Sequence, residues 1–455
     1  MIALDTETTG SDFWHGCKPY YVSAANALSE IWYWEWDVDP YTRQPQIPKS
    51  NIEEIKDLII SSLEASAHNI SYKSDIGIVF QNAKFDIRAL STIGIDIPSL
   101  IGWDNIHDTL VMSHCLNSLE PHGLKYLAHK YLGIPSDDQR ELQQIVQRCR
   151  NKCPKDKILT TGETVKGWRI AKPHDSNWPG IKQAPGNSKT GDSGWWVFDM
   201  WLPLTYHKYI TSLHTQAVNN HHKAGKNKIQ LRKSLRALNE LTTELSIIEN
   251  YPYQLGKYGN RDVERTILLY YLFQNKLHNE NLWNQYEHRR QMLETTYVQE
   301  NVGFTIDLTN LQHQIHYYEQ ETARIDKGLC SFGIRNPQSH QQIADYLHTN
   351  LGLPILQRTD TGKPKTDTAT LEQLAEHLKN KNTDIDPQTI QQGKQVLTSL
   401  LQRSGNATSL RYLEGYNKWR SGNKVHSTVN ITGTKELRQS MSNPNLQNIG
   451  TGKDE

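Results

Sequence analysis

The sequence predicts an α/β domain of short strands and helices, followed by a mostly α-helical region. Residues 1–150 alternate short apolar runs, typical of strands, with helical segments. From Leu204 to about Leu277, and again over 280–350, apolar residues recur at helical spacing, as at Leu308, Leu311 and Ile315. No fixed-period repeat is present, which disfavours a solenoid.

Composition limits the possible partners and compartments. The chain has 455 residues, enough for about three domains. Its net charge of +1 gives no general attraction to nucleic acid, so any DNA binding must come from local patches. Five scattered cysteines favour free thiols in a reducing compartment. There is no leader and no apolar run near ~18 residues, so we expect a cytoplasmic protein, in a bacterium or an infected host.

Three segments of residues 1–150 are expected to form strands. Ile2-Ala3-Leu4 leads into Asp5, residues 31–36 alternate bulky and polar side chains, and residues 76–80 form a short apolar run typical of a buried strand. Residues 150 to about 205 are rich in Lys, Pro, Gly and Asn, with several tryptophans among them. This composition indicates an irregular insertion that docks through its aromatic side chains.

Asp5 and Glu7 form the first candidate site. They lie two residues apart on the first expected strand, so both side chains leave the same face. Two carboxylates at one strand edge suit hard cations such as Mg²⁺ or Mn²⁺, which prefer oxygen ligands. Taken alone, this pair is as well explained by a solvated strand end.

Two further segments add acids. Asn82 is the expected N-cap of a helix whose first turn holds Asp86, where the helix dipole favours an acid. Tyr258 and Asp262 stand at i and i+4 and therefore share one helical face. Each segment alone has an ordinary structural explanation, either capping or an amphipathic helix.

Together, in this order and context, the three segments resemble the Exo I, Exo II and Exo III motifs of DEDD-type 3′–5′ exonucleases with a tyrosine in the third motif. The resemblance implies an RNase H-like α/β fold and two divalent cations, Mg²⁺ or Mn²⁺. It also implies that Asp5, Glu7, Asp86 and Asp262 are metal ligands and that Tyr258 helps to position the attacking water. Asp108 is left out, because an N-cap role explains it. The candidate contacts for a frayed 3′ end are Thr8, Asn82 and Phe85.

The rest of the chain resembles a second family. Three segments follow the order of the thumb in family A, DNA polymerase I-like enzymes. They are residues 336–339 (Asn-Pro-Gln-Ser), 361–363 (Thr-Gly-Lys) and 366–371. Residues 432–440 and 444–449 are similar to the first segment of the palm in that family. By that resemblance Arg438 contacts the primer-terminus minor groove, although an arginine in a polar loop is more often simply solvated. Asn445 and Gln447 are further candidate DNA contacts. The residue sequence of residues 432–440 is of a form associated with viral members of the family.

These segments give a domain division and a functional hypothesis. We expect an exonuclease domain at 1–277, a helical thumb at 278–424 and an incomplete palm at 425–455. The expected activity is metal-dependent 3′–5′ trimming of DNA, which serves proofreading. Nucleotide addition needs palm acids and fingers, which are expected on a second polypeptide or outside this sequence. The rivals are a free-standing exonuclease of the RNase D or Werner type acting on RNA or repair ends, and a non-catalytic DNA-gripping subunit. The basic stretch at 223–236 fits phosphate contact and a solvated helix face equally well.

Overall fold

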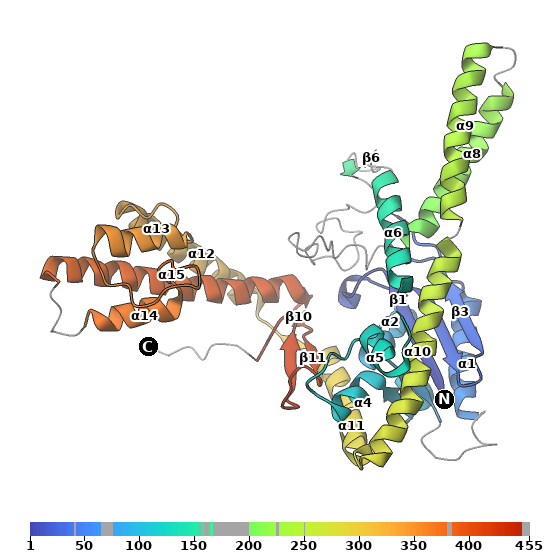
Figure 1. Ribbon diagram of the computed structural model, residues 1–455, viewed down its shortest axis with the longest axis horizontal. Coiled ribbons are helices and arrows are strands. Elements are labelled where there is room, and N and C mark those ends of the chain that lie inside the picture. The colour runs from blue at the N-terminus through green and yellow to red at the C-terminus, as the bar shows by residue number, and fades with distance from the viewer. Residues whose placement is uncertain are drawn as a thin grey trace. The chain divides into compact units, whose positions relative to one another are not determined.

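The computed structural model describes residues 1–40, 42–64, 76–135, 137–153, 156–158, 164–166, 200–223, 227–249, 251–379 and 385–447 (Figure 1). The chain divides into two compact units, which are described separately. The first holds Met1–Asn301 and Val429–Ser440, and the second holds Val302–Thr428 and the residues from Met441. A mixed sheet with surrounding helices forms the first unit, and the second is mainly helical, which confirms the predicted fold class.

A five-stranded sheet is the centre of the first unit. Its strands are β1 (Ile2–Thr8), β2 (Pro19–Asn26), β3 (Ile31–Glu35), β4 (Ile78–Phe80) and β5 (Ile106–Asp108). They lie in the order β3-β2-β1-β4-β5, with β1–β2 and β2–β3 antiparallel and β1–β4 and β4–β5 parallel. All three strands expected from the sequence are present, as β1, β3 and β4.

The helices of this unit are α1 (Lys49–Glu64), α2 (Ala83–Ser91), α3 (Ile97–Ile101), α4 (Thr109–Leu116), α5 (Leu124–Leu132), α6 (Asp137–Lys152), α8 (Leu202–Lys223), α9 (Lys228–Ile248), α10 (Tyr251–Asn279) and α11 (Trp283–Val302). Short 3₁₀ turns stand at Phe13–His15 and Trp103–Asn105. The long helix α10 packs against β1 and β2 and carries Val263, Leu269 and Phe273 into the main core. This helix therefore covers the strand that bears the first two acids.

Helix α11 and the returning segment Val429–Ser440 complete the first unit. Glu300 is buried and pairs with Lys84 at 2.7 Å and Arg88 at 2.8 Å, and it accepts the Val429 N–H at 2.6 Å. Ile431 is part of the same core as the sheet. The compact unit thus extends past residue 277. Compactness is a different criterion from function, so the functional division at 277/278 and 424/425 stays a prediction.

The expected insertion is described only in part. Trp201 is completely buried in a cluster with residues of α6, α8 and α10, as expected of an aromatic anchor. Strands β6 (Asp156–Ile158) and β7 (Thr164–Lys166) pair antiparallel. The remaining tryptophans of the insertion, Trp168, Trp178, Trp195 and Trp196, lie outside the described residues.

The second unit is a helical cluster with small strands. Its elements are β8 (Phe304–Thr305), α12 (Leu308–Ser331), α13 (His340–Ala344), a π-helical segment (Asp345–Asn350), α14 (Thr368–His377), α15 (Pro387–Trp419), β9 (Arg420–Ser421) and β10 (Lys424–Val425). The short strands β11 (Thr428–Asn430) and β12 (Ser440–Ser442) pair where the chain passes between the units. Ser339 accepts the Gln342 N–H at 3.3 Å, which confirms the helix start expected after residues 336–338. Within the described part of the chain, no helix combines the length and apolarity needed to cross a membrane.

Candidate metal centre

Strand β1 presents the first two acids from the middle of the sheet. Asp5 lies opposite Ser23 of β2 and Glu7 lies opposite Tyr21. Alternation along the strand sends both carboxylates to the same face. Both residues pair with β2, so the two acids project from a strand of the sheet rather than from a loop.

Helix α10 reaches this face through an unusually close contact at Gly259. A Cβ atom at Gly259 would lie 2.3 Å from Cε1 of Tyr21, so only glycine allows the approach. Ser23 Oγ donates to the Gly259 carbonyl at 3.1 Å, and the Tyr21 hydroxyl donates to Asn260 Oδ1 at 3.0 Å. This contact sets α10 against β1 and β2 one turn before Asp262.

The result is a cluster of three carboxylates. Oxygen atoms of Asp5, Glu7 and Asp262 all lie within 4.8 Å of one another. Asp262 is buried, and the other two are half-buried. These acids come from sequence positions about 255 residues apart in two motifs, and the fold brings them together.

Asp86 joins from the other side of β1. Strand β1 pairs with β4 only through Ile2 and Ala3, so its edge is open from there on. Asp86, in the first turn of α2, uses that edge and accepts hydrogen bonds from Thr6 N at 3.0 Å and Thr6 Oγ1 at 2.7 Å. The carboxylate is buried and fixed, and its charge acts on Asp5.

The electrostatics of the acids fit a cation. Burial raises the pKa of Asp5 well above its usual range, and the charges of Asp86 and Glu7 raise it further. Burial, followed by the charge of Asp262, raises the pKa of Glu7 to about 8. The pKa of Asp86 is raised to about 8, again chiefly by burial. The three clustered carboxylates, with Asp86 acting on Asp5 from nearby, offer the oxygen ligands that a hard divalent cation prefers, and its charge would keep them ionised.

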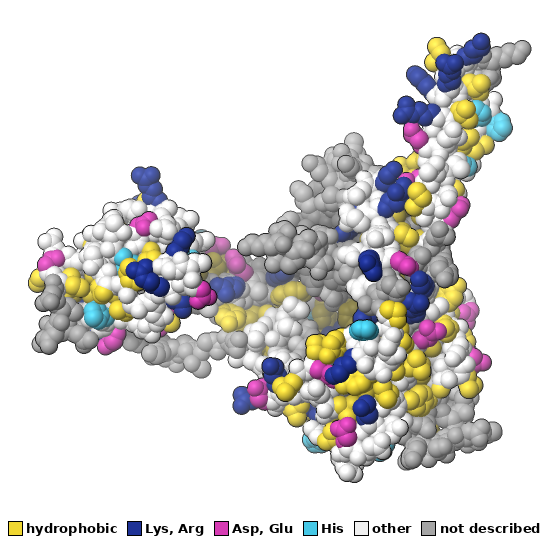
Figure 2. Space-filling view, in the orientation of Figure 1, with side chains coloured by type: hydrophobic (Ala, Val, Ile, Leu, Met, Phe, Trp, Pro, Cys, Tyr) yellow, Lys and Arg dark blue, Asp and Glu magenta, His cyan; other side chains and the backbone are white. Residues whose placement is uncertain are grey.

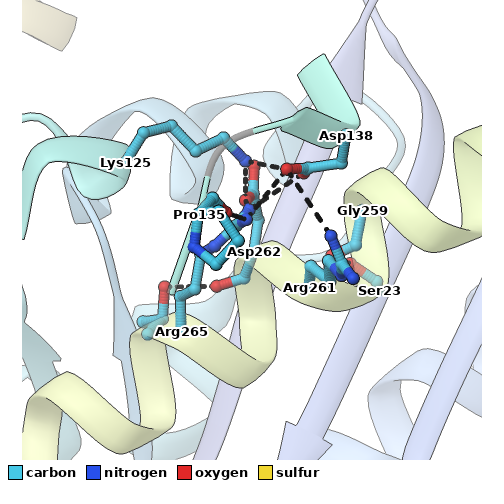
Figure 3. A network of polar contacts seen from close by, with 9 residues as sticks. Ser23, Lys125, Pro135, Asp138, Gly259, Arg261, Asp262 and Arg265 are labelled. Carbon is cyan, nitrogen blue, oxygen red and sulfur yellow. Dashed lines mark hydrogen bonds and ion pairs between the residues drawn. The ribbon is translucent and has the colours of Figure 1, made fainter. Parts of the chain in front are cut away.

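A basic network holds Asp262 from behind (Figure 3). Arg265, almost completely buried, donates to Asp262 Oδ1 at 2.8 Å and to both oxygens of Asp138 at 3.0 and 2.9 Å. Lys125 of α5 contacts Asp262 and lies 3.5 Å from Asp138. The network leaves the Asp262 carboxylate with little freedom to turn away from β1.

Tyr258 lies one turn before Asp262 on the same helix, as expected. The Lys125 Nζ lies 4.1 Å from the centre of its ring. Burial, followed by the charge of Asp262, raises the pKa of the Tyr258 hydroxyl well above its usual range. The phenol therefore stays protonated and can donate a hydrogen bond at neutral pH.

The remaining candidates of the first unit have varied surroundings. Thr8 Oγ1 donates to the Gly10 carbonyl at 2.8 Å, and Phe85 makes an edge contact with Phe13 at 5.1 Å between ring centres. Helix α2 begins after Asn82 as expected, but the Asn82 side chain makes no cap bond. The Asp108 carboxylate accepts the Asn82 and Ala83 N–H groups, each at 2.9 Å, because it already lies beside the start of α4.

Asp108 also accepts the Leu110 N–H at 2.9 Å, which confirms its expected N-cap role. Arg438 is an exposed residue of the segment 429–440 in the first unit, where its N–H donates to Thr434 Oγ1 at 2.8 Å. Asn445 and Gln447 belong to the second unit, and Asn445 Oδ1 accepts the Gln447 N–H at 2.9 Å. The role of these three residues in DNA binding stays a prediction.

Sequence reasoning missed the residues that orient the acids, namely Thr6, Lys125, Asp138, Gly259 and Arg265. Arg265 was detectable, since it stands three residues after Asp262 on the same helix and so lies next to it. Gly259 was also visible, as a glycine inside a long helix, which usually has a packing reason. The contact between Asp138 and Arg265 was not detectable, because nothing in the sequence around Asp138 indicates a partner in α10.

Comparisons with known proteins agree with both regions. A family model described as DNA polymerase family A matches residues 308–455, and one described as 3′–5′ exonuclease matches residues 57–158. No curated protein sequence matches the chain. A similar solved structure is the POL domain of Pol1 from M. smegmatis in complex with DNA primer-template and dNTP, with 14% identity and a TM-score of 0.49. That match covers 100% of this chain and 52% of the other, so the chain spans about half its length.

Proposed function

We propose that the first unit is a metal-dependent 3′–5′ exonuclease that trims DNA ends and serves proofreading. The observation that carries the proposal is the meeting of Asp5, Glu7 and Asp262 within 4.8 Å, inside a chain that matches a 3′–5′ exonuclease family over 57–158. Asp86 lies within the matched residues and is fixed beside Asp5 by Thr6.

In this proposal the four acids would hold two divalent cations, Mg²⁺ or Mn²⁺. Bound there, the cations would supply an activated water and stabilise the leaving 3′ oxygen. The chain itself holds the acids in place. Thr6 fixes Asp86 through two hydrogen bonds, and Arg265 fixes Asp262. The protonated Tyr258 hydroxyl is available to orient the water by donating or accepting a hydrogen bond.

The test is trimming of a 3′-labelled mismatched primer-template with Mg²⁺. We expect Asp5→Asn and Glu7→Gln to abolish trimming and to weaken Mg²⁺ or Mn²⁺ binding measured by calorimetry. Asp57→Asn is the matched control, since Asp57 is an exposed acid of α1 in the same unit. Full trimming and unchanged cation binding in Glu7→Gln would refute the proposal.

For the second unit we propose a grip on primer-template duplex, supported by the family A polymerase match over 308–455. The candidate contacts within the matched residues are Asn445 and Gln447 of this unit and Arg438 of the first unit. Nucleotide addition would then depend on palm and fingers residues outside this sequence, on a second polypeptide or on a further segment. The viral, cytoplasmic setting of such a polymerase is a hypothesis that rests on the sequence alone.

The second candidate function is a free-standing exonuclease of the RNase D or Werner type. Trimming of single-stranded RNA and of a DNA primer-template at equal enzyme concentration separates the two. Preference for the primer-template supports the proofreading assignment, because only that substrate offers the duplex that the second unit would grip. Preference for RNA would favour the alternative.

A further inference from the structure

Helices α8 and α9 form an antiparallel hairpin whose outer face has no partner among the described residues. Helix α9 packs against α8, which in turn packs against α6 and α10. The seam holds half-buried Leu238, Leu241 and Leu245, and His221 Nδ1 lies 3.0 Å from Ser234 Oγ. The opposite face of α9 is exposed along most of its length.

The distal half of this hairpin has a strongly one-sided charge. Residues 211–239 contain no Asp or Glu but six cations: Lys223, Lys226, Lys228, Arg232, Lys233 and Arg236. Lys226 lies outside the described residues. Figure 2 shows Lys and Arg side chains gathered over the end of the hairpin. In a chain whose net charge is only +1, this is a local cationic surface against a background that is otherwise net negative.

The cations on α9 share one face. Ile229, Arg232, Lys233 and Arg236 follow the i, i+3, i+4, i+7 spacing of a single helix face. Ile229 is 69% exposed. Arg236 pairs at 3.0 Å with Glu240, the first acid after the acid-free residues 211–239. No ion pair of Arg232 or Lys233 occurs in the described part of the chain. A fold that needed these charges only for solubility would be expected to intersperse acids among them.

We propose that the distal α8–α9 hairpin is a contact surface for the phosphate backbone of the DNA that the first unit trims. This inference rests on the proposed exonuclease function, which makes a long polyanion the substrate. Flexible, unpaired Lys and Arg side chains suit sequence-independent phosphate contact. An acidic protein partner would satisfy the charge as well, but it requires a second ligand, whereas the substrate already supplies the negative charge.

The length of the hairpin would extend the surface that long DNA can contact. Helix α8 has 22 residues, which corresponds to a length of about 33 Å at 1.5 Å per residue. A trinucleotide extends only about 10 Å at the 3.4 Å rise per nucleotide of one strand. Long substrates would therefore use the hairpin, and a trinucleotide bound at the acids would not. The surface should strengthen binding of long DNA without altering trimming of a trinucleotide.

The test compares Arg232→Gln/Lys233→Gln with Lys49→Gln/Lys56→Gln, a matched double variant on α1 of the same unit. Dissociation constants for a 40-nucleotide primer-template with a single-stranded 3′ end are measured against salt concentration without divalent cations. We expect the hairpin variant to lose roughly tenfold in affinity near 0.15 M salt and its log–log salt slope to fall by about two. Arg232→Lys/Lys233→Arg should restore both, and the α1 variant should match wild type.

An unchanged affinity and slope in the hairpin variant would overturn the proposal and leave an acidic protein as the partner to seek. Trimming of a trinucleotide, measured in parallel with Mg²⁺, tests the exonuclease proposal separately from the hairpin proposal. If wild type trims the trinucleotide and the hairpin variant trims it equally, the site and the surface act independently, as proposed. If wild type trims nothing, the exonuclease assignment fails, and the salt slopes still decide the hairpin. A loss of trinucleotide trimming in the hairpin variant would contradict the proposed separation.

Discussion

Adding one methyl group at Gly259 is expected to damage both the stability and the candidate site of the first unit. In Gly259→Ala the new Cβ would lie 2.3 Å from Cε1 and 3.0 Å from Cζ of Tyr21. Tyr21 is completely buried and its hydroxyl bonds Asn260, so the ring cannot simply swing away. Helix α10 must therefore shift from β2, taking Tyr258 and Asp262 with it.

The size of the expected destabilisation follows from overpacking of the core. Forcing an extra methyl into a packed core costs about 1–3 kcal/mol. The same change at Gly256, three residues earlier on the same helix, meets no atom within 4 Å. There the removal of glycine from a helix interior should stabilise by about 0.5–1 kcal/mol. The two Gly→Ala variants should thus differ by roughly 1.5–4 kcal/mol in the free energy of unfolding.

Urea unfolding followed by tryptophan fluorescence measures this difference for the first unit. All twelve tryptophans except Trp419 precede residue 302, so the signal reports mainly on that unit. Trimming of the mismatched primer-template is measured on the same samples at a temperature where both variants are folded. We expect Gly259→Ala to lose most of its activity and Gly256→Ala to keep it, because only the first moves Asp262.

Equal stability and equal trimming in the two variants would refute the close contact between α10 and β2. A further check is the double variant Tyr21→Leu/Gly259→Ala, in which a shorter side chain removes the clashing ring. If the clash is the cause, the destabilisation of the double variant should be smaller than the sum of the two single effects, with a coupling of about 0.5–3 kcal/mol. Strict additivity would point to another cause.

Three further outcomes are expected. Glu300→Ala should destabilise the first unit by about 3–5 kcal/mol in urea unfolding, since it leaves the largely covered side chains of Lys84 and Arg88 without their buried acid, and a loss below 1 kcal/mol would contradict this. Asp108→Ala should lower the free energy of unfolding by about 1–4 kcal/mol, because two helices lose the carboxylate that accepts N–H groups at their starts. The Mg²⁺ affinity measured by calorimetry should stay unchanged, and weaker Mg²⁺ binding would instead make Asp108 a ligand. The pKa of Glu7 is raised from 4.5 to about 8 by burial, so the metal-free folded state keeps a proton that the unfolded state releases, and stability should fall as pH rises from about 4.5 to 8. Glu7→Gln should flatten that decline, and an unchanged pH profile would show that the carboxyl is not buried in this way.

The sequence predicted the parts of this protein that have local signals. Alternating and apolar runs located β1, β3 and β4, and spacing of two on a strand and of four on a helix correctly placed acids on shared faces. Helix starts at Ser339 and Asp108 were visible because capping is chemistry between neighbours. The contacts that join distant segments to one another could not be predicted from such local signals.

The Asn82 cap illustrates the limit. Its residue type and position favoured a side-chain bond to the N–H groups of the first helical turn, but the Asn82 side chain makes no such bond. The carboxylate of Asp108, 26 residues away, instead accepts the N–H of Asn82 itself. The backbone of Asn82 is left-handed, with φ 73° and ψ 57°, whereas a residue whose side chain caps a helix typically lies in the β region, so the cap bond does not form. The Arg265–Asp138 contact is similar, since it joins α10 to α6 across 127 residues.

The return of Val429–Ser440 to the first unit makes residues 302–428 an insertion in that unit rather than an appendix after it. The chain leaves at Asn301 and comes back beside the same point, because the Glu300 carboxylate accepts the Val429 N–H at 2.6 Å. A fragment that ends at residue 301 would lose Ile431 from its core. It would also lose the Val429 carbonyl that accepts a hydrogen bond from the half-buried Lys84 Nζ. A minimal form of the first unit would instead join residue 301 to residue 429 through a short loop and keep the segment to residue 440. The first unit and the inserted helices could then be studied as separate molecules.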